Sequence, residues 1–458
     1  MIRWIPLPWT VRHISRDAGE NWTNITPPDM PDSGTVNILE VSPHTAGRAF
    51  ISVVRFRLDD FRPYVFRTDD FGESWTLLTD GTNGIPADQW VRAVREDPDR
   101  TGLLYAATEY GVFVSFDDGA HWQSLQLNFP VAPVTDLVVH EKDLVLSTKG
   151  RSFWILDDLS PLHQLTDEVA GSAAHLFAPR DAHRVRTAEE EAVDEYVGGW
   201  RSVANPRDLY GGARITRDRQ GTDAPNGATI YTWFAEAPAG EVTLEVLNAA
   251  GEVIRRFSSE DDPKDASVIA RPEAPFFKEE STFFNAGLNR FVWDLRHPPA
   301  LGGAPLGPLV VPGTYRIRVS TGDWSGTQPI EVLRDPRVTT TAGEFQSQFD
   351  LLLRLRDRIT DLHRAVAEIR ELREGASASV AERLTRIERE LVPLPEDYDR
   401  EDQDYAPKLI QQLDLLYGYV EGADSEPTDS AFERFDDLDP ILSGLLEELR
   451  GVAESVGN

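Results

Sequence analysis

Thr68-Asp69-Asp70-Phe71-Gly72-Glu73-Ser74-Trp75 is one of three occurrences of a short pattern in the first third of the chain. The other two are residues 15–22 and 115–122, and all three read Ser/Thr-x-Asp-x-Gly-x-x-Trp. The pattern begins at positions 15, 68 and 115, so successive occurrences are 53 and 47 residues apart. This spacing is about the period of a four-stranded β-propeller blade. The repeat therefore predicts a β-propeller.

The pattern is the Asp-box, which forms the turn of a β-hairpin. The Asp side chain can accept hydrogen bonds from backbone N–H groups a few residues on, which closes the turn. The Gly supplies a positive φ, and the Trp returns into the next strand and covers the turn. Three equivalent Asp residues on three blades cannot all face one central site, so we expect structural roles. The predicted structural residues are Asp17, Gly19, Trp22, Asp70, Gly72, Trp75, Asp117, Gly119 and Trp122.

The strands around these turns predict that residues 1–165 form a partial Asp-box β-propeller of about three to four blades. The last unit, residues 134–156, reads as three strands without an Asp-box. An open stack of blades would leave unpaired strands and an apolar blade face in water. We therefore expect the chain to be the C-terminal part of a longer protein, with the remaining blades on another polypeptide or lost.

The pattern changes twice beyond residue 165. Residues 166–226 carry Gly pairs, an Asn-Pro step and an acidic run, and we expect an irregular linker. Short alternating segments across 227–338 predict an immunoglobulin-like β-sandwich. Apolar residues then recur every three to four positions, so 339–458 is expected to be an α-helical hairpin or bundle. A fourth helix is expected to begin near Pro440.

Composition narrows the choice of partners. The formal net charge is −31, which argues against nucleic acid and anionic membrane surfaces because phosphate binding needs a basic surface. The chain has 5 Lys against 41 Arg, which indicates either a salt-adapted source or a GC-rich genome. It has no Cys and no apolar run long enough to span a membrane. The first residues do not read as a signal peptide.

Several longer stretches resemble a bacterial family described as sortilin-like or BNR-repeat glycosyl-hydrolase proteins. The resemblance rests on residues 58–64, 94–98, 111–119 and 150–158, and on 287–296 and 335–337 in the second half. It implies a large Asp-box propeller, an Ig-like module and a helical tail in a secreted or cell-envelope protein. The hydrolase label in that family rests on the likeness of its propeller to sialidases and xyloglucanases.

A glycoside hydrolase needs two carboxyl groups roughly 5–10 Å apart across a cleft. Candidate catalytic residues outside the Asp-boxes are Glu109, Arg151, Asp60 and Arg62. Glu109 and Arg151 follow predicted strands and are expected to point into the mouth of the ring. No His, Asp or Glu cluster shows metal-ligand spacing, and no Gly-rich phosphate loop is present, so we expect neither metal nor cofactor.

Three functional hypotheses follow. The first is a non-catalytic binding or scaffold protein for a protein or glycan ligand, with the missing blades supplied by another polypeptide. The second is a carbohydrate-active enzyme of the sialidase or xyloglucanase type. The third is a non-functional remnant. The sequence favours the first.

Overall fold

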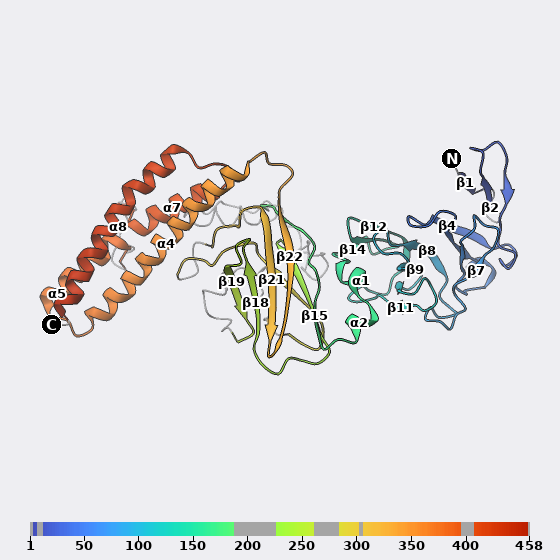
Figure 1. Ribbon diagram of the computed structural model, residues 1–458, viewed down its shortest axis with the longest axis horizontal. Helices are drawn as coiled ribbons and strands as arrows, with labels where there is room; N and C mark the ends of the chain where they lie inside the picture. The colour runs from blue at the N-terminus through green and yellow to red at the C-terminus, as the bar shows by residue number, and fades with distance from the viewer. Residues whose placement is uncertain are drawn as a thin grey trace, which may run out of the picture. The chain divides into compact units, whose positions relative to one another are not determined.

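The computed structural model describes residues 3–6, 12–186, 226–260, 284–301, 306–394 and 407–456. The chain divides into two compact units, residues 1–165 and 166–458. Within these described residues the protein is mainly β, with several sheets followed by a helical region at the C-terminus (Figure 1).

The described residues of the first unit form four antiparallel sheets that follow one another along the chain. The first sheet is β1 (Arg3–Pro6), β2 (Arg12–Ser15) and β3 (Thr23–Asn24). The second is β4 (Thr35–Val41), β5 (Ala49–Val54), β6 (Val65–Thr68) and β7 (Thr76–Leu77). The third is β8 (Val91–Glu96), β9 (Leu104–Thr108), β10 (Val112–Ser115) and β11 (Gln123–Ser124). The fourth is β12 (Val134–His140), β13 (Asp143–Thr148) and β14 (Phe153–Leu156).

The second strand of the central sheets is buried on both faces. All residues of β5 and of β9 are buried. The third sheet packs between the second and the fourth, whereas the second sheet packs on the third with one face and is covered on the other by a cluster that includes Met30, Tyr64 and Trp75. One apolar cluster joins the second sheet to the third, through Phe50 and Val65 on one side and Val94 and Leu104 on the other. Another cluster joins the third sheet to the fourth. Short elements complete the unit, namely a 3₁₀ turn at Phe56–Leu58 and helix α1 (Ser160–Gln164).

The three Asp-box turns have the same hydrogen bonds. In the second turn, Asp70 Oδ1 accepts from the Thr68 hydroxyl at 2.8 Å and from the Ser74 backbone N–H at 2.8 Å. The Thr68 hydroxyl in turn accepts from the Gly72 N–H at 2.8 Å. The turns at 15–22 and 115–122 repeat these bonds with Asp17 and Asp117. The carboxylates are therefore engaged in closing the turns.

Two consecutive residues in each turn have positive φ. In the second turn these are Phe71 at 62° and Gly72 at 89°. The turn is also packed against the preceding sheet, because a Cβ added at Gly72 would lie 2.6 Å from Ile25 Cβ. The Trp75 indole donates to the Ile25 carbonyl at 2.7 Å. Trp22 instead donates to the Gly19 carbonyl of its own turn at 3.1 Å.

Arginine side chains also connect the turn region of the second sheet to that of the third. Arg48 donates to Asp69 at 2.6 Å and to Asp118 at 3.1 Å. Arg67 contacts the same two carboxylates, at 3.0 and 2.7 Å. The residues next to the turn-closing Asp therefore join neighbouring sheets.

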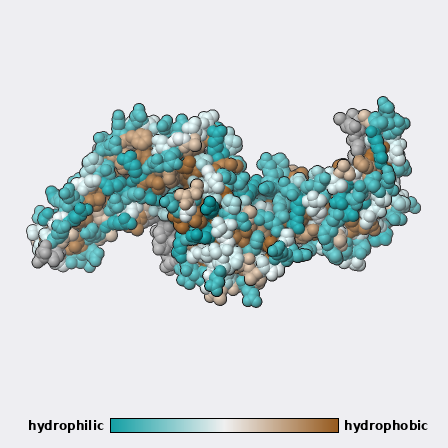
Figure 2. Space-filling model, in the orientation of Figure 1, coloured by the Kyte–Doolittle hydropathy of each residue, from teal (hydrophilic) through white to brown (hydrophobic). Residues whose placement is uncertain are grey.

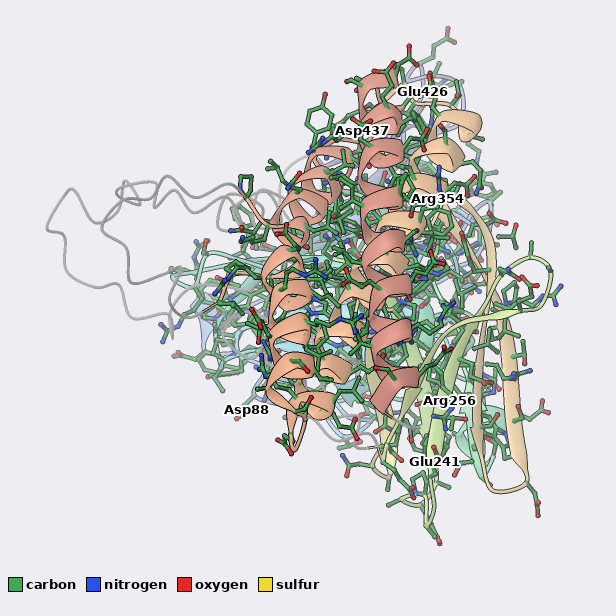
Figure 3. All side chains as sticks on the ribbon, turned by 90° about the vertical axis from the view of Figure 1, so that its left-hand side faces the viewer. Asp88, Glu241, Arg256, Arg354, Glu426 and Asp437 are labelled. Atoms are coloured by element: carbon green, nitrogen blue, oxygen red, sulfur yellow. The ribbon has the colours of Figure 1, made fainter. Side chains whose placement is uncertain are left out.

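In the second unit, the part of the chain that the structure describes forms two further sheets around one apolar core. The three-stranded sheet is β15 (Ala174–Leu176), β17 (Ala228–Phe234) and β20 (Gly287–Trp293). The five-stranded sheet is β16 (Ala182–Arg184), β22 (Trp324–Arg334), β21 (Gly313–Thr321), β18 (Val242–Leu247) and β19 (Val253–Ser258). Figure 3 shows Glu241 and Arg256 close together beside this sheet, and their side chains form an ion pair of 2.6 Å.

Part of the expected linker 166–226 has regular structure. Helix α2 (Asp167–Ala170) begins at Thr166, whose hydroxyl accepts from the Val169 N–H. Strand β15 then adds to the three-stranded sheet by pairing with β17, and β16 adds to the five-stranded sheet by pairing in parallel with β22. The expectation of an irregular segment is thus wrong for these residues, because their partners lie far along the chain. Residues 187–225 lie outside the described residues.

The C-terminal region is helical, with α4 (Ala342–Arg373), α5 (Ala378–Leu391), α7 (Leu409–Glu421) and α8 (Asp429–Val456). Helix α4 lies beside both α7 and α8 (Figure 1). The expected start of the last helix near Pro440 is wrong, because Pro440 lies inside α8. On the face drawn in Figure 2, hydrophobic residues are visible between hydrophilic ones over the helices. No helix among the described residues is long and apolar enough to cross a membrane.

Buried ion pairs connect these helices to the sheets of the second unit. Arg184 on β16 and Asp424 after α7 form a pair of 2.8 Å with side chains only 2% and 4% exposed. Arg184 also donates to Gln348 on α4 at 3.0 Å. Arg296 forms a second buried pair with Glu421 at the end of α7. The helical region and the sheets are therefore one packed body.

Candidate functional site

The first strands of three successive sheets share one irregularity. Strands β4, β8 and β12 each contain a β-bulge, at Asn37, Arg92 and Thr135. Each bulge lies opposite the end of the second strand of its sheet, next to the loop that leads into the third strand. We call this end, with the loops 55–64, 109–111 and 149–152, the bulge end. The Asp-box turns lie at the opposite end of the third strands. Bulges are frequent next to functional sites because they redirect side chains.

Arg92 organises the middle of the bulge end. Its guanidinium donates to Glu109 Oε2 through Nε at 2.8 Å and makes a second, shorter contact through Nη2. The Arg92 carbonyl, which the bulge exposes, accepts from Asn37 Nδ2 at 2.7 Å and from the Ser52 hydroxyl at 2.8 Å. Glu109 is therefore paired with an arginine from the neighbouring strand of its own sheet.

Aromatic rings surround Arg92. Its guanidinium carbon lies 5.8 Å from the centre of the Trp90 ring and 5.9 Å from that of Phe56. Phe56 stacks on Trp90 with ring centroids 5.3 Å apart, and Phe61 contacts the same indole at 5.4 Å. Trp90 is buried, whereas Phe61 and the nearby Tyr110 are exposed. The bulge end thus combines charged and aromatic groups.

Asp60 and Arg62 form a second cluster in the loop 55–64. Asp60 accepts from Arg62 Nε at 2.9 Å, from Arg55 at 2.7 Å and from the Tyr64 hydroxyl at 2.9 Å. These bonds, led by those from Arg62, hold the pKa of Asp60 well below its usual range. Asp60 is therefore ionised at neutral pH and cannot serve as a general acid.

Arg151 lies in the loop 149–152 and is exposed. Its N–H donates to the Thr148 hydroxyl at 3.1 Å, and its carbonyl accepts from the Trp154 indole at 3.0 Å. Of the four candidates from the sequence, the structure brings Asp60 and Arg62 into contact. Within the described part of the chain, no hydrogen bond or ion pair joins Glu109 or Arg151 to these two.

A third cluster, which the sequence analysis missed, joins the first strands of three sheets. Arg95 on β8 donates to Glu40 on β4 at 2.8 Å and to Asp136 on β12 at 2.9 Å. Its Nε donates to the Leu137 carbonyl at 2.9 Å. Burial raises the pKa of Glu40, although Arg95 opposes this effect. Asp136 is half exposed. No sequence signal singled out this cluster, because β8 also carries Arg92 and Glu96 and the partners of Arg95 lie 55 and 41 positions away.

The described residues also bring together one group of side chains with metal-ligand chemistry, which sequence spacing does not indicate. The ligand atoms of Asp97, Asp99 and His163 lie within 4.8 Å of one another. However, Asp97 Oδ2 already accepts from the Tyr105 hydroxyl at 2.9 Å and lies 2.9 Å from His163 Nε2. Its Oδ1 accepts two backbone N–H bonds. These contacts explain the group as a structural connection between β9 and α1.

Comparisons with known proteins give only distant likenesses. No family model matches the chain, and no curated protein matches it. Among solved structures, the extracellular domain of the BT4673 one component system of B. thetaiotaomicron aligns at 11% identity and TM-score 0.26 over 72% of this chain. An ancestral GH74 enzyme aligns at 12% identity and TM-score 0.25 over 56%. The GH74 xyloglucanase from Xanthomonas campestris aligns at 14% identity and TM-score 0.22 over 72%.

The chain spans 35%, 32% and 60% of the lengths of these three structures. Likenesses at this level do not assign the chain to a family.

Proposed function

We propose that the sheets of residues 1–165 are successive blades of an Asp-box β-propeller, followed by an Ig-like sandwich and a helical bundle. In this proposal the protein is a non-catalytic binding or scaffold protein. It takes a peptide or glycan ligand at the bulge end, where Arg92, Glu109 and the loop 55–64 lie. The repeated spacing of turns and bulges along the chain supports the propeller assignment.

One observation carries the non-catalytic assignment: each candidate carboxylate is engaged by arginine. Asp60 is held by Arg55 and Arg62, and Glu109 is held by Arg92. A glycosidase acid must be protonated at working pH, and its partner carboxylate must be available to water or to the sugar. Carboxylates closed into ion pairs satisfy neither need. Paired charges beside exposed aromatic rings are instead common at recognition surfaces.

Binding and turnover assays with the intact protein test this proposal. The wild type should hydrolyse neither aryl β-glucosides nor xyloglucan oligosaccharides nor sialosides. It should retain members of a glycan array or a displayed peptide library, and Arg92→Ala should reduce that retention. Arg256→Ala is the matched control, because it removes an Arg–Glu pair of the second unit. Turnover by the wild type, or equal retention by both variants, contradicts the proposal.

A second candidate function is glycoside hydrolysis at the Glu40–Arg95–Asp136 cluster. Arg95 engages both carboxylates here too, but burial still raises the pKa of Glu40, which is the property that a general acid needs, and Asp136 is half exposed and so remains open to water. If this candidate is right, Glu40→Gln should abolish hydrolysis of a natural glycoside. It should affect an aryl glycoside with a good leaving group much less, because that leaving group needs no proton.

A further inference from the structure

The third sheet shows what covers a sheet face in this stack. Its residues Tyr105, Val112 and Val114 belong to the apolar cluster that the fourth sheet completes with Leu137 and Leu146. Val112 and Val114 are only 1% and 3% exposed. The face of one sheet is therefore buried by the next sheet of the same kind.

The fourth sheet repeats this face residue by residue. In the third sheet, Val112 and Val114 on β10 pair with Ala107 and Tyr105 on β9. In the fourth sheet, Phe153 and Ile155 on β14 pair in the same way with Ser147 and Val145 on β13. Phe153 and Ile155 thus occupy the positions of Val112 and Val114. They are 74% and 55% exposed.

These exposed side chains continue across the whole sheet. Val138 on β12 pairs with Val145, and Val145 pairs with Ile155, so the three lie in one row on one face. Val138 is also exposed. We call Val138, Val145, Phe153 and Ile155 the outer face. Strand alternation points the intervening Leu144, Leu146 and Trp154 into the core on the other side.

The edge beside the outer face is also open. Strands β6 and β10 each pair with a short fourth strand. Within the described residues, β14 pairs with β13 alone. Exposed apolar faces and open edges are uncommon in isolated soluble domains because they promote association.

We propose that the outer face binds an antiparallel β-sheet of a second copy of this chain. The equivalent face of the third sheet is covered by another sheet of the same repeat. We therefore expect a sheet of the same kind to cover the outer face, and a second copy of this chain carries such sheets. The four residues of the outer face are uncharged, and Asp136, which pairs with Ser147 in the row of Phe153, is held by Arg95. Burial of apolar area is therefore the driving force. The two copies repel one another because each carries a net charge of −31, so salt should strengthen the association.

This inference extends the proposed scaffold role by naming a partner. A labelling experiment on the full chain tests it directly, because the protein has no cysteine. Ile155→Cys should react with a maleimide at least tenfold more slowly at about 100 µM protein than at about 0.1 µM, because mass action fills the face. Val253→Cys is the control, since Val253 is an exposed apolar strand residue of the second unit. Its rate should not depend on protein concentration.

Light scattering after gel filtration supplies the second measurement. The wild type should elute as an oligomer whose population grows with salt. Phe153→Asp should give a monomer with an unchanged circular dichroism spectrum, because this side chain is exposed in the single chain, whereas Val253→Asp should remain oligomeric. Rapid labelling of Ile155→Cys at every concentration would overturn the proposal. So would slow labelling in a monomer, which would mean that the chain covers its own face. Turnover of a glycoside would contradict the proposed function and leave these outcomes unchanged.

Discussion

The glycine of each Asp-box has a positive φ and, in some of the turns, also lies too close to a neighbouring residue for a Cβ to fit. Replacing it by alanine separates the effects of these two constraints. Gly19 and Gly72 have similar φ values, 104° and 89°. They differ in what an added Cβ would meet. At Gly72 it would lie 2.6 Å from Ile25 Cβ and 2.7 Å from Ile25 Cδ1, whereas at Gly19 the nearest atom is Trp22 Cζ2 at 3.7 Å.

The expected magnitudes follow from this geometry. An alanine held at positive φ costs about 1–2 kcal/mol, and both variants bear this cost. Overpacking adds about 1–3 kcal/mol where the neighbouring chain cannot move away. The Ile25 Cβ is close to the backbone and cannot rotate aside. Gly72→Ala should therefore lose about 3 kcal/mol of unfolding free energy, and Gly19→Ala about 1 kcal/mol.

Urea unfolding of the full chain is combined with hydrogen exchange of peptides from β2 and β3 for Gly19→Ala and from β6 and β7 for Gly72→Ala, which measures the loss in each affected sheet. Gly119→Ala provides an intermediate case, because its Cβ would lie 2.7 Å from Leu78 Cδ1, the movable end of that side chain, and 3.3 Å from Leu78 Cβ. Equal losses for Gly19→Ala and Gly72→Ala would contradict this prediction. They would show that turn conformation alone, and not docking on the preceding sheet, requires the glycine.

Three further predictions concern charge. Asp424→Asn should destabilise the second unit by about 3–5 kcal/mol in chemical denaturation, because it removes a carboxylate from the buried Arg184. Burial lowers the pKa of His297 to about 4, so the native state disfavours its protonated form. Stability should therefore fall by about 2 kcal/mol as pH decreases from roughly 6.5 to 4, and His297→Phe should flatten this part of the pH profile. Hydrogen bonds led by that from the Ser74 hydroxyl lower the pKa of Asp70 to about 2. The ionised Asp70 therefore contributes to the free energy of unfolding above about pH 4, and this contribution is lost as the pH falls toward 2. Asp70→Asn should remove this part of the decrease in urea midpoint at low pH.

Local sequence patterns predicted the elements whose interactions are short in range. The Asp-box motif indicates a closed turn because Asp70 bonds to residues two and four positions away. The regular spacing of apolar residues indicates the helices, because the buried residues on one face of a helix recur every three to four positions. Asp60 and Arg62 could be paired from the sequence for the same reason, since they are two residues apart.

The remaining features depend on residues that are distant in the sequence. Arg95 contacts Glu40 and Asp136 across 55 and 41 positions. Arg184 contacts Asp424 across 240 positions. With 77 acidic residues in the chain, no sequence pattern selects these partners. The start of α8 was missed for a different reason, because tertiary packing of Leu438 and Leu442 on either side of Pro440 offsets the helix-breaking tendency of proline.

The preference for arginine over lysine has a structural explanation in this fold. A guanidinium presents five N–H donors in a fixed plane, whereas an ammonium acts as a point charge. Arg95 uses three nitrogens to hold two carboxylates and a carbonyl on neighbouring strands, and Arg48 contacts carboxylates from two sheets. One arginine can therefore neutralise acidic residues of successive sheets at once. This multiplicity lets an acidic chain stack sheets closely, and it also occupies the carboxylates that a hydrolase would need free. This use of the carboxylates fits the proposed binding role, in which they are not needed for catalysis.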